Sequence, residues 1–247
     1  MPIKRPQIIK GEIYHVVSRA VEGVLLFKEE KDYFRMIHDL FEFNDENPTD
    51  WTYRQSYEKR SRSEGSESHS KECSGEKNKR KRKLLVAILA FCLMPNHMHL
   101  LVKQLHEKGI SKFMRKIGAG YGLYYNKKYN RSGHLFQGRY RIVHVKSEEQ
   151  LQTAFVYIHT NPVSLIVPNW REKGIPKDQL RKVIEFLEEK YRWSSYLDYL
   201  GKKNFPSLTS RDFLTKIMGG KEGCREYVNA WLEHKKELRD LEKIALE

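Results

Sequence analysis

Two histidines, His97 and His99, are separated by one residue in the apolar segment HMHLLV. In a β-strand, residues i and i+2 point to the same face, so both imidazoles would project together while Met98 faces the other way. Two imidazoles on one face form half of a divalent metal site. The alternative is two histidines on a solvated strand face, and the H-x-H pattern alone does not decide between them.

A second group lies in the segment YIHTNP, where Tyr157 and Asn161 are four residues apart and so share one face of a helix. A tyrosine hydroxyl is a poor nucleophile at neutral pH because its pKa is near ~10, but a nearby divalent cation and the loss of bulk water can activate it. The amide oxygen of Asn161 suits a hard metal such as Mg²⁺ or Mn²⁺. Spacing alone does not select Tyr157 among 14 tyrosines, because an ordinary amphipathic helix also explains it.

The charge of the chain indicates a polyanionic partner. Lys and Arg number 46 and Asp and Glu number 32 in 247 residues, which gives a formal net charge of +14. Such an excess attracts nucleic acid. No apolar run approaches the ~18–20 residues that span a bilayer, and the first residues do not resemble a signal peptide. Three scattered cysteines without a C-x-x-C pair favour a reducing, cytoplasmic compartment.

The hydrophobic pattern predicts an α+β fold. Alternating or continuous apolar runs predict strands over 12–18, 84–94, 97–105 and 142–146. Helical spacing predicts helices over 29–44, 109–129 and 148–160, the last with Ser147 as its N-cap. This order is that of a ferredoxin-like antiparallel sheet with helices packed on it. We expect it to form a catalytic domain over 1–168, followed by a helical C-terminal extension over 169–247, with helices over 177–190, 194–200, 210–217 and 222–246.

Residues 54–83 differ from the rest of the chain, because Tyr57 and Cys73 are the only plausible core residues among them. Such a segment cannot bury enough apolar surface to offset the entropy of ordering it. We therefore predict a disordered basic insertion in a surface loop. Its cationic end, KNKRKRK, is either solvated or acts as an electrostatic arm for phosphates.

Five segments together resemble the HUH single-strand-DNA transposases, in particular the REP-associated tyrosine transposases. They are GEIYHVVSRAVEG, AFCLMPNHMHLLV, RSGHLFQGRYR, YIHTNPV and RWSSYLDYLG. They occur in the order found in that family and cover most of residues 11–201 apart from the insertion. The motif set is specific, whereas H-x-H alone would be weak.

The resemblance implies an activity and a role for four residues. His97 and His99 would bind a divalent metal, Mg²⁺ or Mn²⁺, which Asn161 would complete, and Tyr157 would be the nucleophile. The implied reaction is attack on a phosphodiester of single-stranded DNA at a hairpin, which leaves a 5′-phosphotyrosine link and a free 3′-OH, as in DNA transposition. Relatives act as monomers or homodimers.

Basic and polar residues outside these motifs are candidates for DNA contact, because such side chains bind phosphates and base edges. They are Lys112, Arg115 and Lys116 in the helix predicted over 109–129, and His134, Gln137, Arg139 and Arg141 in the loop that follows it. A solvated face explains the first three equally well. His15, on the first predicted strand, could neighbour the site, but we interpret it as an ordinary sheet histidine.

Two other functions remain open from the sequence. A non-catalytic protein that binds hairpin DNA or RNA on the same fold would need the same charge and loops. A metal-dependent hydrolase unrelated to nucleic acid would need a carboxylate beside the histidines and has no evident use for the positive charge.

Overall fold

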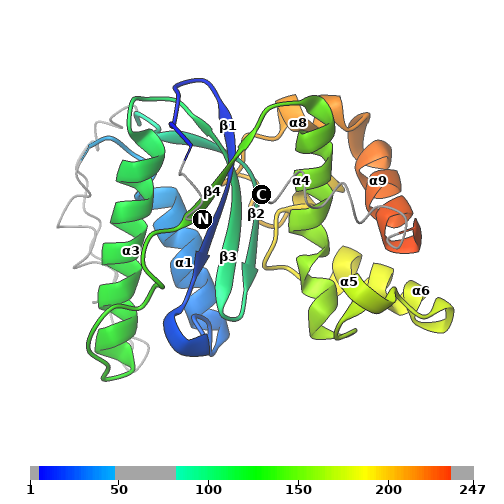
Figure 1. Cartoon of the computed structure of the whole chain (residues 1–247), viewed down its shortest axis with the longest axis horizontal. Coiled ribbons are helices and arrows are strands. Elements are labelled where there is room, and N and C mark those ends of the chain that lie inside the picture. Colours follow the sequence, from blue (N-terminus) through cyan, green and yellow to red (C-terminus); the bar gives the residue numbers. More distant parts are fainter. Residues whose placement is uncertain (1–5, 48–81, 235–247) are drawn as a thin grey trace, which may run out of the picture.

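The computed structural model describes residues 6–47 and 82–234. Its centre is an antiparallel sheet with the strand order β2-β3-β1-β4 (Figure 1). The strands are β1 (Ile13–Arg19), β2 (Val86–Met94), β3 (His97–Gln104) and β4 (Arg141–Val145). This order, with the predicted alternation of strands and helices, confirms the α+β class with a ferredoxin-like sheet.

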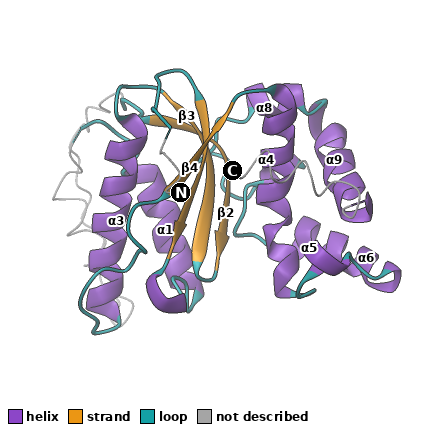
Figure 2. Cartoon of the chain, viewed as in Figure 1, coloured by secondary structure: helices purple, strands orange, loops and turns teal. Residues whose placement is uncertain are grey.

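Helices cover both faces of the sheet (Figures 1 and 2). On one face lie α1 (Glu30–Glu42) and α3 (Gly109–Lys128), and on the other lies α4 (Glu148–Thr160). A 3-10 turn, η2 (Asn161–Leu165), continues α4. The C-terminal helical region beyond it consists of α5 (Trp170–Lys173), α6 (Lys177–Glu185), the π-helix η3 (Phe186–Lys190), α7 (Tyr196–Tyr199), α8 (Asp212–Ile217) and α9 (Gly220–His234).

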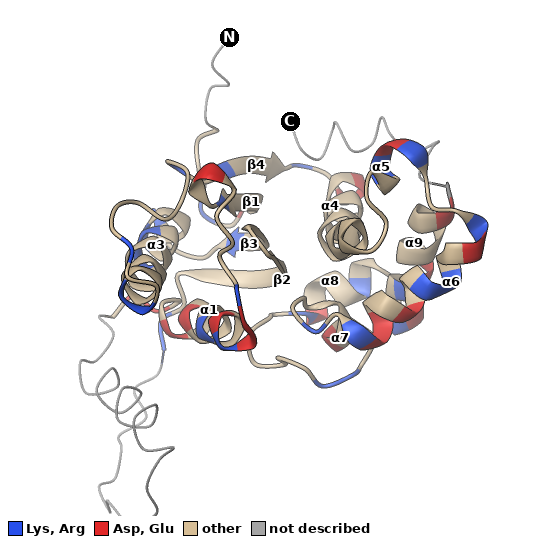
Figure 3. Cartoon of the chain, turned by 90° about the horizontal axis from the view of Figure 1, so that it is seen from below, with Lys and Arg blue, Asp and Glu red and all other residues tan. Residues whose placement is uncertain are grey.

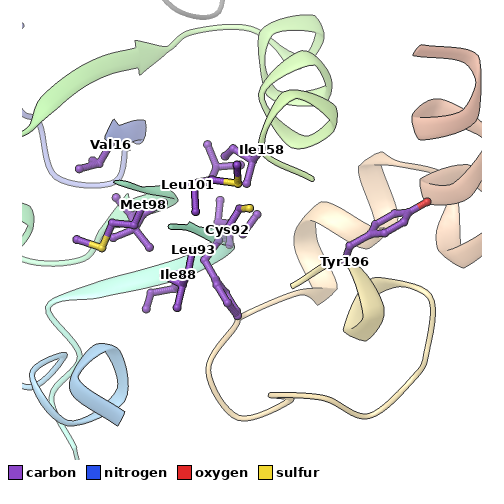
Figure 4. Packing of buried hydrophobic residues seen from close by; sticks show 14 of the residues in the cluster. Val16, Ile88, Cys92, Leu93, Met98, Leu101, Ile158 and Tyr196 are labelled. Atoms are coloured by element: carbon purple, nitrogen blue, oxygen red, sulfur yellow. The ribbon is translucent and has the colours of Figure 1, made fainter. Parts of the chain in front are cut away.

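The pleat of β3 separates the two sides of the core. Met98 is buried on the face opposite to its histidine neighbours, as the alternation predicts. On the other face, Leu101 and Cys92 lie toward Ile158 of α4 (Figure 4). Both faces of β2 are apolar, which explains why its sequence is a continuous apolar run.

The outer edge of β2 is covered by a segment from the C-terminal region. The Leu93 amide donates to the Trp193 carbonyl over 2.9 Å, and the Ser195 amide donates to the Phe91 carbonyl over 3.0 Å. Covering an apolar edge strand in this way satisfies backbone groups that would otherwise be open to another chain. The C-terminal region is therefore joined to the sheet by backbone pairing as well as by helix packing.

At one end of the sheet, which lies at the bottom in Figure 1, three loops meet. The Ala20 amide donates to the Asn96 carbonyl over 2.9 Å, and the Leu26 amide to the Pro95 carbonyl over 2.7 Å. The Gln137 amide donates to the Arg19 carbonyl over 2.8 Å. The loop predicted to contact DNA is therefore attached to the end of β1, beside the start of β3.

The predicted insertion over 54–83 lies outside the described residues except for its last two, Arg82 and Lys83. Among the helices that are described, none is long and apolar enough to cross a membrane.

Candidate active site

Three imidazoles meet on the face of the sheet that α4 covers. The β1–β3 register places His99 opposite Val17 and His97 opposite Arg19, and His15 lies one pleat further along β1. His15 Nε2 is 3.0 Å from His99 Nδ1, and the two rings stack with centroids 5.2 Å apart. The rings of His97 and His99 have centroids 4.9 Å apart. The histidines form one cluster across two neighbouring strands.

The ring of Tyr157 projects from α4 toward this cluster. Its centroid is 5.6 Å from that of His99 and 5.8 Å from that of His15, both in edge-to-face orientation. His159, two residues later, points elsewhere, and its Nε2 lies 2.8 Å from Ser195 Oγ. The helix therefore presents the tyrosine to the histidine cluster.

Asn161 and Arg171 lie beside Tyr157. The Asn161 side-chain amide donates to the Tyr157 carbonyl over 2.8 Å, and its oxygen accepts a bond from Arg171 Nη2 over 2.9 Å. The Arg171 guanidinium carbon is 4.1 Å from the centroid of the Tyr157 ring, a cation–π contact. Asn161, one helical turn after Tyr157, and the Arg171 cation from α5 therefore both lie beside the tyrosine.

Burial and nearby cations keep the imidazoles neutral. Burial, followed by the charges of Arg19 and Arg171, lowers the pKa of His97 to about 4. Burial, followed by the charge of Arg171, also lowers the pKa of His15 to about 4. The pKa of His99 lies well below its usual range, mainly through burial and then through the other two histidines. Neutral imidazole is the form that binds metals.

Two ring nitrogens of the histidine cluster are suited to binding a divalent cation. His99 Nε2 is buried with no hydrogen-bond partner among the described residues. His97 Nδ1 lies 2.6 Å from Asn96 Oδ1, a contact that fixes the tautomer and leaves Nε2 as the ligating atom. The Asn161 oxygen retains a second lone pair beside its bond from Arg171. Within residues 6–47 and 82–234, no group of three or more His, Cys, Asp or Glu side chains forms a metal cage.

The predicted DNA-contact residues lie in two places. Lys112 and Lys116 are turned toward the segment after α1: Lys112 Nζ is 3.6 Å from Glu46 Oε1, and Lys116 Nζ donates to the Asn47 carbonyl over 3.0 Å. Arg115 is exposed on α3. The remaining candidates, all exposed and near the end of the sheet that carries His97, are His134, Gln137, Arg139 and Arg141.

Seen from that end, Lys and Arg positions lie on α3 to one side of the sheet and on α5 and α6 to the other (Figure 3). Two residues of the site, Arg19 and Arg171, had no assigned role in the sequence. His15, interpreted there as an ordinary sheet histidine, instead contacts His99 within the cluster. The alternation of β1 places His15 and Arg19 on one face, but only the pairing with β3 shows that this face carries the other histidines. No periodic signal marks the four-residue helix that holds Arg171.

The buried histidines predict an acid-labile fold. Burial lowers the pKa of His159 to about 3, and that of His15 is about 4. An unfolded histidine titrates near ~6.5, so from there down to the folded pKa the unfolded chain binds more protons and stability falls with falling pH.

We expect a loss of about 2 kcal/mol per fully buried histidine between pH 7 and pH 5, measured by urea unfolding with a chelator present. His159→Gln should show a shallower pH dependence than the native protein. Identical pH dependence in both proteins would contradict this account.

A model of a known protein family matches part of the chain. Residues 54–161 match the family model "Transposase IS200 like", which confirms the resemblance seen in the sequence motifs. Comparison with curated proteins finds no match. A solved structure of a REP-associated tyrosine transposase bound to a REP hairpin is similar with a TM-score of 0.48 and 15% sequence identity, over 83% of this chain and 90% of that chain.

Proposed function

From the IS200-like transposase match over residues 54–161, we propose that this protein cleaves and rejoins single-stranded DNA at hairpins through a covalent link to Tyr157. The observation that carries the proposal is the contact of one tyrosine ring with two of three clustered, neutral imidazoles. A protein that only binds hairpins has no need for this combination of a tyrosine, paired imidazoles and a partnerless buried ring nitrogen.

In the proposed reaction, the Tyr157 hydroxyl oxygen attacks the scissile phosphorus. The bond between this oxygen and phosphorus forms, the bond from phosphorus to the 3′ oxygen breaks, and the hydroxyl proton leaves while the 3′ oxygen gains one. The product is a 5′-phosphotyrosine and a free 3′-OH, and attack by a 3′-OH reverses the step. Because one phosphoester replaces another, no nucleotide cofactor is needed.

The chain's own residues prepare this attack. The packing of α4 against the sheet sets the ring of Tyr157 beside His99. The side chains of His97 and His99 would hold Mg²⁺ or Mn²⁺, with Asn161 as the candidate third ligand. When bound, such a cation supplies a Lewis acid that stabilises charge on the phosphate oxygens. The exposed residues His134, Gln137, Arg139 and Arg141, near the same end of the sheet, are the proposed DNA contacts, with Lys112, Arg115 and Lys116 as a second group.

The proposal is tested by trapping the covalent intermediate. A labelled DNA hairpin with single-stranded flanks is incubated with the protein and Mn²⁺ or Mg²⁺ and analysed by denaturing gel electrophoresis. We expect a labelled species at the mass of protein plus DNA, and its loss when a chelator removes the metal. Hairpin binding without any such species would favour the non-catalytic binding protein instead.

A further inference from the structure

Arg171, a cation in the candidate active site, comes from a helix outside the matched segment. It lies in α5, ten residues after Asn161, whereas the family match ends at residue 161. Its neighbour Trp170 is only 1% exposed, so α5 is anchored in the core at this point. The place of the guanidinium is thus set by packing.

The guanidinium of Arg171 lies against the two functional side chains at the end of α4. Its carbon is 4.1 Å from the centre of the Tyr157 ring, and its Nη2 donates to the Asn161 oxygen over 2.9 Å. Tyr157 and Asn161 are one helical turn apart. Both contacts together hold a positive charge next to the ring that carries the proposed nucleophile.

The surroundings of Arg171 suit an anion. Arg19 lies opposite His97 on the neighbouring strand. No carboxylate joins the three imidazoles in a metal-binding group among the described residues. A half-buried cation that lies against a tyrosine ring attracts a negatively charged group more strongly than one in bulk water.

We infer that Arg171 binds a non-bridging oxygen of the phosphate that Tyr157 attacks, an inference that rests on the function proposed above. Guanidinium groups donate paired N–H bonds to phosphate oxygens. Negative charge develops on these oxygens as phosphorus is attacked, and fixed donors stabilise it. Arg171 transfers no proton in this step, because it stays charged throughout.

A purely structural role for Arg171 makes a different prediction. If its purpose is only to join α5 to Asn161, Arg171→Gln and Arg171→Lys should have similar effects, because glutamine and lysine both keep an N–H donor. If it binds phosphate, Arg171→Lys should be milder, because lysine keeps the charge. Lys173→Gln removes one positive charge from the same helix at an exposed position and is the matched control.

The contact is tested by binding, independently of cleavage. In the Tyr157→Phe protein, affinity is measured for a DNA hairpin whose flanking phosphates are replaced, one position at a time, by neutral methylphosphonates. With Arg171 present, we expect one position to weaken binding by about 10-fold, and with Arg171→Gln we expect no loss there, as for two groups in contact. An equal loss in both proteins, or no sensitive position, overturns the inference.

Adduct formation gives the second measurement. We expect Arg171→Gln to slow it by about 100-fold, as for the loss of one transition-state donor, with a smaller loss for Arg171→Lys and a change below about 2-fold for Lys173→Gln. A normal rate with Arg171→Gln refutes the role of Arg171 and leaves the proposed function intact. Absence of adduct in the native protein refutes the proposed function, while the methylphosphonate series still decides whether Arg171 contacts phosphate.

Discussion

Replacing Tyr157 by phenylalanine is expected to abolish the covalent protein–DNA adduct while leaving the fold and hairpin affinity nearly unchanged. The substitution removes one oxygen, and the contacts of Tyr157 with His99, His15 and Arg171 are made by its ring. The free energy of unfolding should therefore change by less than about 0.5 kcal/mol. Without the oxygen no bond to phosphorus can form, so the rate should fall by at least about 10⁴-fold, as when other enzymes lose their nucleophile.

The measurement is adduct formation on a denaturing gel, paired with thermal unfolding and hairpin binding. Tyr227→Phe is the matched control, because Tyr227 is 42% exposed on α9 and should keep full activity. Tyr125 is the alternative candidate for the nucleophile. Because its hydroxyl already donates to the Leu25 carbonyl over 2.7 Å, we expect Tyr125→Phe to keep the adduct. Adduct that persists in Tyr157→Phe and disappears in Tyr125→Phe would show that the nucleophile has been assigned wrongly.

Replacing either His97 or His99 by alanine is expected to remove both metal binding and cleavage. In metalloproteins, loss of an outer partner of a ligand lowers metal affinity roughly 10–100-fold, so loss of a ligand should lower it by at least about 100-fold. His15 touches His99 Nδ1 rather than the proposed metal. We therefore expect His15→Asn to weaken Mn²⁺ binding less than His99→Ala does.

Mn²⁺ affinity is measured by titration calorimetry without DNA, so that the result does not depend on activity. His106→Ala, which changes a histidine in the loop before α3, is the control and should bind Mn²⁺ like the native protein. Undiminished Mn²⁺ binding in both His97→Ala and His99→Ala would contradict the proposed ligands.

The elements with a clear period were predictable from the sequence. The helix expected over 148–160 has these bounds in the structure, and Ser147 Oγ accepts the Gln150 amide as an N-cap. The alternation of HMHLLV correctly placed Met98 on the opposite face from the histidines. In both cases local spacing decides which side of an element each residue occupies.

Contacts between distant segments were not predictable in this way. The bond between His15 and His99 joins residues 84 positions apart and depends on the register of β1 against β3. Arg171 follows Asn169, whose φ is +60°, and its helix is too short for a hydrophobic period. Its place beside Tyr157 results from the burial of Trp170, which a single sequence does not reveal.

The strip of chain over 193–195 that borders β2 also bears on how the protein is made. Phe91 and Ser195 pair across 104 positions, so the outer edge of β2 stays open while roughly a hundred further residues are synthesised. At about 5–20 residues per second, that interval lasts about 5–20 seconds, and during it the apolar edge strand is available to other nascent chains. The outer edge of β2 is therefore covered only after residue 195 has been synthesised, and a ribosome-bound chain that stalls before this residue keeps that edge open.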